Sequence, residues 1–269
     1  MSAAAAPPSA PPASPPPVTL PPRTGTLRDS GSVRRDSVRA ARWSSSGIAK
    51  VQGDVDVESG SAAGFVSVGG KLTAGTFGSR GTLEVVGPTD VRDGLTLDGT
   101  VHFQGPVHAG TLGARGTLEC TAEVRVDRAF TLIGTLEAPS LRVGLLELTG
   151  TVAVPGEVEA LASVRARFRG DSVIGSLRAR SAVLQGPSVA LIPSLLRAVF
   201  GGSVTVHVDR VEADSVELSA VDVEFIRSPK IVLGPGAHLT AFEGTIVRQH
   251  PSSRVGPESR SRPPYGLTR

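Results

Sequence analysis

The residues of this sequence whose types and spacing could do chemistry are a row of acids with one histidine among them. Glu84, Glu119 and Glu137 each end the motif Gly-Thr-Leu-Glu, and His102 takes the same place in the related motif Gly-Thr-Val-His. Stacked carboxylates can bind a cation or act as a paired acid and base. Such a row is also common on a solvated surface, where screening weakens the repulsion between like charges. We favour the surface interpretation.

The single cysteine and the five histidines give no sign of a nucleophile or a metal site. Cys120 falls at a core position, where a thiol lacks the exposure and the activating neighbour that reactivity needs. No two histidines have the H-x-x-x-H or H-E-x-x-H spacing of common zinc sites. The histidines are His102, His108, His207, His238 and His250.

Cofactor and nucleic-acid motifs give no positive signal either. The glycine-rich turns are not followed by Gly-Lys-Ser or Gly-Lys-Thr, so they do not read as phosphate loops. One Trp, one Tyr and eight Phe are too few for an aromatic platform that stacks single-stranded bases. We therefore expect no enzyme activity, cofactor, small-molecule substrate or specific nucleic-acid partner.

The motif Gly-Thr-Leu-Glu belongs to an internal repeat, and a repeat of this length is typical of solenoid folds. Successive units begin 16 to 18 residues apart. Within each unit apolar and polar residues alternate, which is typical of strands with one buried face, and Gly, Pro or Asp separates the alternating pieces. The units begin at Gly64, Gly81, Gly99, Gly116, Gly134 and Gly150.

Stacking the units on their glycines gives two apolar columns with a mostly polar column between them. This pattern predicts an all-β fold, a parallel β-helix with about 17–18 residues per coil, in which three short strands make one triangular coil. The first apolar column is Leu83, Val101, Leu118, Leu136 and Val152, the second is Val85, Phe103, Cys120, Ala138 and Val154, and the outward column is Glu84, His102, Glu119, Glu137 and Ala153.

Composition divides the chain into five parts. Residues 1–46 are rich in Pro, Ala and Arg and predict a disordered tail, because they offer little apolar surface to bury. Residues 47–189 are the β-helix, 190–202 a short amphipathic helical insertion, 203–249 further β-helical coils, and 250–269 a second disordered, basic tail. The insertion is predicted from Ile192, Leu195, Leu196 and Val199, which have helical spacing.

The charge is distributed unevenly. Residues 1–46 and 247–269 each carry a net charge of +4, and residues 47–246 carry −5. Basic arms of this kind contact anionic lipid, nucleic acid or the acidic body of a neighbouring copy, or simply keep a tail solvated. The first residues lack the basic and apolar regions of a signal peptide, so we expect a cytoplasmic protein.

The sequence lacks the patterns of two enzyme classes that use β-helices. Hexapeptide acyltransferases need an aliphatic residue followed by Gly at every sixth position, and that pattern is missing. Polysaccharide lyases have longer coils with acidic and Arg clusters on one face, which are also missing.

The sequence resembles the bactofilins, polymer-forming cytoskeletal proteins, over roughly residues 47–246. The coil length and the Gly-Thr coil starts carry part of the resemblance. The segment from Val211 to Leu239 is similar to the end of the longer Gram-positive type. Its matching residues are Val211, Glu212, Asp214, Val216 and Leu218, then Ile231, Leu233, Gly234, Pro235 and Gly236.

The resemblance implies a right-handed β-helix that polymerises end to end without nucleotide, and a scaffold role in cell shape, division, motility or protein positioning. The expected partners are further copies of the chain, other scaffold or cell-envelope proteins, and an anionic membrane bound weakly at its inner face. The alternative left open is a β-helical adaptor that forms no filaments and binds through its faces and basic tails. We expect the polymer contact at Val55 and Val57 near one end and at Phe242 near the other.

Overall fold

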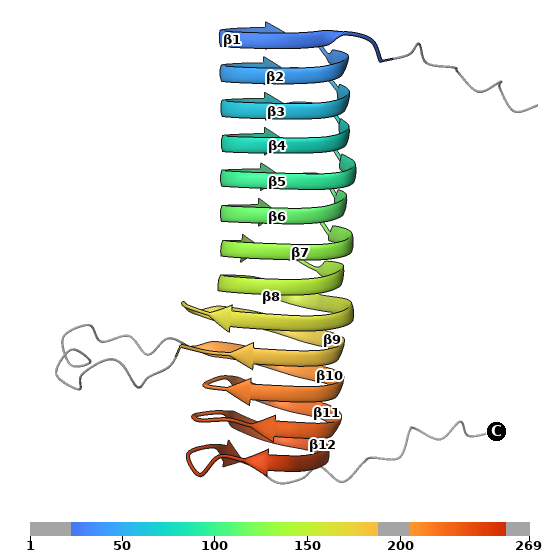
Figure 1. Ribbon diagram of the computed structural model, residues 1–269. Coiled ribbons are helices and arrows are strands. Elements are labelled where there is room, and N and C mark those ends of the chain that lie inside the picture. Colours follow the sequence, from blue (N-terminus) through green and yellow to red (C-terminus); the bar gives the residue numbers. More distant parts are fainter. Residues whose placement is uncertain (1–22, 188–204, 257–269) are drawn as a thin grey trace, which may run out of the picture.

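The computed structural model describes residues 23–187 and 205–256 and shows a right-handed parallel β-helix (Figure 1). Every described strand pairs in parallel with the next one in sequence, so strand order in space equals strand order in the chain. The strands are β1 (Thr26–Arg35), β2 (Val38–Val51), β3 (Val55–Val68), β4 (Leu72–Val85), β5 (Thr89–Phe103), β6 (Val107–Cys120), β7 (Val124–Glu137), β8 (Leu141–Phe168), β9 (Ser172–Gln185), β10 (Val206–Ser219), β11 (Asp222–Leu233), β12 (His238–Gln249) and β13 (Arg254–Val255). No helix occurs among the described residues.

Each coil buries its side chains in three pairs, as the alternation in the sequence predicts. In β4 the buried pairs are Leu72 with Ala74, Phe77 with Ser79, and Leu83 with Val85. The chain bends between the pairs while its ladder hydrogen bonds continue. The core is therefore a narrow column of apolar side chains along the axis rather than a wide globular interior.

The strand pairing confirms the predicted columns. Leu83 pairs with Val101, and Val101 pairs with Leu118. These three side chains are at most 1% exposed, as expected for a stack of inward residues. The outward residues Glu84 and His102 pair in the same way one position later. The step of 16 to 18 residues between glycines is thus one turn of the β-helix.

The glycines that begin the units form a column of their own in which a side chain has no room. Gly99 has a φ of +123°, which L-residues rarely adopt, and a Cβ there would lie 2.1 Å from the carbonyl oxygen of Gly81. The same collision with the preceding coil recurs along the column. Glycine is thus needed both for the bend and for the close approach of neighbouring coils.

The prediction that residues 1–46 are a disordered tail is wrong for its second half. β1 and β2 extend the β-helix back to Thr26, and Gly31 and Gly47 extend the glycine column. The reason is that these coils need few large side chains. The indole of Trp43 fills the core here and reaches Phe77 across Gly60, with ring centroids 6.3 Å apart.

The same strands overturn the expected position of Val55 and Val57. Both are fully buried in β3, where Val38 and Ala40 of β2 pair with them on the N-terminal side. They cannot form the contact at that end. Phe242 does lie near the other end, in β12, and its role in a polymer contact remains a prediction.

The interruption of the repeat near residue 190 does not change the stacking of the coils on either side of it. β9 pairs directly with β10 in a continuous register from Ser172–Val206 to Gln185–Ser219. The predicted amphipathic helix at 190–202 lies outside the described residues. The second predicted tail begins too early, because β13 lies within residues 250–269 and pairs with the start of β12.

Candidate functional site

The row of acids forms as predicted, and its geometry is that of a solvated surface row. Glu84, His102, Glu119 and Glu137 follow one another on the third side of successive coils. The one direct contact in this row joins His102 Nδ1 to Glu119 Oε2 at 3.3 Å. Both side chains remain well exposed, at 36% and 47%. A catalytic acid and base would need a bound substrate between them, and none of these four residues lines the pocket around Gly113.

Cys120 is buried in the core, as the sequence predicts. Burial raises the pKa of its thiol to about 12, and the nearby charge of Glu119 adds to the effect. A thiol with such a pKa stays protonated at neutral pH, so it is a weak nucleophile and a weak metal ligand.

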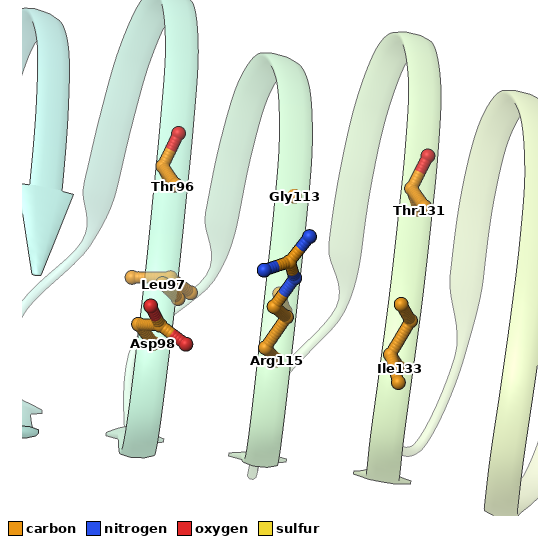
Figure 2. A pocket seen from close by; sticks show the side chains of 8 residues that line it. Thr96, Leu97, Asp98, Gly113, Arg115, Thr131 and Ile133 are labelled. Atoms are coloured by element: carbon orange, nitrogen blue, oxygen red, sulfur yellow. The ribbon is translucent and has the colours of Figure 1, made fainter. Parts of the chain in front are cut away.

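A shallow pocket lies over Gly113, on the side of the coils that carries the second buried pair of each strand, such as Phe77 with Ser79 in β4 (Figure 2). It exists because Gly113 offers no side chain between Thr96 on β5 and Thr131 on β7. Asp98 and Arg115 lie at one edge. The pocket brings together no nucleophile with a base, and its floor is sheet backbone already paired in the ladder.

The two ends of the β-helix are chemically different, and they are the strongest candidate sites. At the C-terminal end, β12 pairs with β13 only through His238 and Leu239. Among the described residues, no strand pairs with the remaining outer edge of β12. Val247 on this edge is 60% exposed, and Ile246 is half-buried. An unpaired edge with apolar side chains is a template for another strand.

The N-terminal end contains a partly buried ion pair between Asp29 and Arg35. Asp29 of β1 faces inward and is only 6% exposed, although it is an acid. Arg35 donates to it from Nη2 at 2.6 Å and from Nε at 3.0 Å, and Trp43 Nε1 donates at 3.0 Å. The hydrogen bond from Arg35 lowers the pKa of Asp29 below its ordinary value, against the opposing effect of burial. At neutral pH the Asp29–Arg35 pair stabilises the first coil. The outer edge of β1 pairs with no described strand.

Gly31 is the first member of the glycine column and lies at this N-terminal edge. Its φ is +77°, like that of the glycines below it. A Cβ on Gly31 would meet no described atom within 4 Å, whereas a Cβ on Gly47 would lie 2.4 Å from the Gly31 carbonyl oxygen. A side chain at position 31 would therefore point along the axis, into the space that a further coil would occupy.

Sequence reasoning missed the first two coils and therefore placed the N-terminal edge at the wrong residues. The signal was available, because Gly31 and Gly47 continue the spacing of the later glycines. It also missed a cluster at His207, in which residues from two neighbouring coils meet.

The chain matches no protein-family model, no curated protein and no solved structure. Within residues 23–187 and 205–256, no helix has the length and apolar character needed to cross a bilayer. The fold is a β-solenoid, which is compatible with a structural or scaffold role.

Proposed function

We propose that this protein is a non-enzymatic structural subunit whose copies stack end to end into filaments without nucleotide, as its resemblance to the bactofilins implies. The observation that carries the proposal is that, among the described residues, the strand edge at each end of the stack is wholly or largely unpaired. β1 offers one edge and β12 offers most of the other, and no described helix covers either.

An unpaired strand edge leaves backbone N–H and C=O groups without partners and favours pairing with another chain. A second copy that added its coil to this edge would continue the ladder at the ~4.8 Å spacing of the interior coils. Apolar burial at Val247 and Ile246 would add to the contact. Because the contact is backbone pairing and apolar burial rather than ion pairing, the filaments should persist in high salt.

We place the protein in the cytoplasm, as a scaffold that organises other scaffold or cell-envelope proteins. Its weak membrane contact would be made by the basic residues near the two ends. All six arginines of residues 1–46 lie among the described residues, and three of the five in residues 247–269 lie outside them.

Electron microscopy of the purified protein in nucleotide-free buffer tests the proposal. We expect filaments from the wild type, and we expect Val247→Lys to abolish them because it places a charge on the β12 edge. Leu161→Lys is the matched control, since Leu161 is 59% exposed and lies on β8, in the middle of the stack. This control should form normal filaments.

Monodisperse wild-type particles at high protein concentration would instead support an adaptor that does not polymerise. Filaments formed equally well by Val247→Lys would remove the β12 edge from the contact.

A further inference from the structure

We propose that His207, Asp209 and Glu224 form a binding site for a divalent transition-metal ion of the Zn²⁺ class. His207 and Asp209 both lie on β10, two residues apart, and Glu224 lies on β11, the next coil. The Nε2 atom of His207 is 3.1 Å from Asp209 Oδ1 and 3.4 Å from Glu224 Oε1. One donor atom from each residue lies within 4.8 Å of the other two.

These distances are those between neighbouring ligands of one metal ion. Imidazole nitrogen and carboxylate oxygen bind Zn²⁺ at about 2.0–2.2 Å. Two such donors are then about 3.0 Å apart when the angle at the metal is 90°, and about 3.4 Å apart when it is tetrahedral. The two contacts of His207 fall at these values. The third pair of donor atoms, on Asp209 and Glu224, lies within 4.8 Å, so side-chain rotation could close all three residues on one ion and solvent could complete its coordination.

The charge around the cluster also favours a cation. Among the described residues, neither Asp209 nor Glu224 has a Lys or Arg within ion-pair distance, and each pairs only with His207. Arg210 between them in sequence is turned away, since it pairs with Glu212 and lies over the ring of Phe225. Two neighbouring carboxylates thus share one imidazole, and no described Lys or Arg forms an ion pair with either of them.

The cluster around His108 shows the contrast. His108 also lies between two carboxylates, at 3.3 Å from Asp90 and 3.0 Å from Asp127. There, however, Lys71 contacts Asp90 and Arg125 contacts Asp127. The carboxylates at His108 are compensated by permanent cations, and a metal ion would have to compete with them.

The strands hold the proposed ligands in place. The pairs Val208–Val223 and Arg210–Phe225 fix the register of β10 on β11. Val208 and Val223 are buried beside the ligands, at 0% and 1% exposure. An ion bound to both strands would join two coils close to the C-terminal edge. Asp222 is the ladder partner of His207, so a further carboxylate stands next to the site.

The test is titration of EDTA-treated, dialysed full-length protein with ZnCl₂ by isothermal titration calorimetry, and with CoCl₂ by visible absorption. We expect one site per chain in the wild type, with Co²⁺ absorption bands typical of a site with nitrogen and oxygen ligands. His207→Ala should weaken Zn²⁺ binding more than tenfold, because losing even an outer-shell partner of a metal ligand costs 10–100-fold. His108→Ala is the matched control and should bind as the wild type does.

His207→Lys separates coordination from ion pairing. Lysine places a positive charge next to both carboxylates, so the variant should fold normally by circular dichroism and give no Co²⁺ bands. The proposal is overturned if the wild type binds no Zn²⁺, or if His207→Ala and His207→Lys bind it as tightly as the wild type. None of these outcomes depends on filament formation, because the measurement can be repeated with the Val247→Lys variant.

Discussion

Gly99→Ala should unfold the β-helix or destabilise it by about 3 kcal/mol or more. Two effects add at this position. The φ of +123° is unfavourable for any residue with a Cβ. The new Cβ would also lie 2.1 Å from the carbonyl oxygen of Gly81, which is ladder backbone and cannot move aside without breaking pairing. Thermal or urea unfolding followed by far-ultraviolet circular dichroism measures the effect.

Gly113→Ala is the control for this prediction. A Cβ at Gly113 would meet no described atom within 4 Å, and its φ is not positive. We expect a change within about 1 kcal/mol, with stabilisation as the expected direction because alanine restricts the unfolded chain. Equal losses of stability in the two variants would show that glycine as such, rather than the stacked column, determines the effect.

Leu118→Asp should cost more than about 3 kcal/mol of stability. Leu118 is 1% exposed between Val101 and Leu136 in the inward column. The substitution removes apolar burial and places a carboxylate where no partner can reach it. The same unfolding measurement applies.

Glu119→Gln, one residue later, is the matched surface change. Glu119 points outward, and its contact with His102 is largely exposed, so its loss should shift stability by only about 0.5 kcal/mol. Similar unfolding midpoints for Leu118→Asp and Glu119→Gln would contradict the inward and outward assignment of this side.

The repeat made the middle of the fold predictable. Periodicity of two defined the strands, and the glycine spacing defined the coil, so the columns around Leu83 and Val85 follow from sequence alone. The columns are predictable because a solenoid repeats one local environment, so each position of the unit is buried or exposed in the same way in every coil.

The start of the fold was not predictable from composition. A scarcity of large apolar residues normally indicates disorder. In these coils one Trp43 ring, packed toward Phe77 across Gly60, fills core space along several coils. Asp29 is also kept inside by Arg35 of the same strand and by Trp43 of the next coil, and composition does not reveal these contacts.

The proposed metal site was hidden for a related reason. Sequence motifs for metal sites assume ligands on one helix or one loop, whereas Glu224 reaches His207 from the next coil. In a solenoid, residues one coil apart in sequence are neighbours in space. A search at that spacing, beginning from the His-x-Asp of residues 207–209, would have found the cluster.

The most direct test of end-to-end stacking is electron microscopy of Gly31→Asn. Asparagine tolerates the φ of +77° at this position, and no described atom lies within 4 Å of its Cβ, so the single subunit should fold and melt as the wild type does. The side chain would occupy the space that the next subunit's coil needs. The account predicts a folded protein that forms no filaments. Filaments of wild-type length from Gly31→Asn would contradict it.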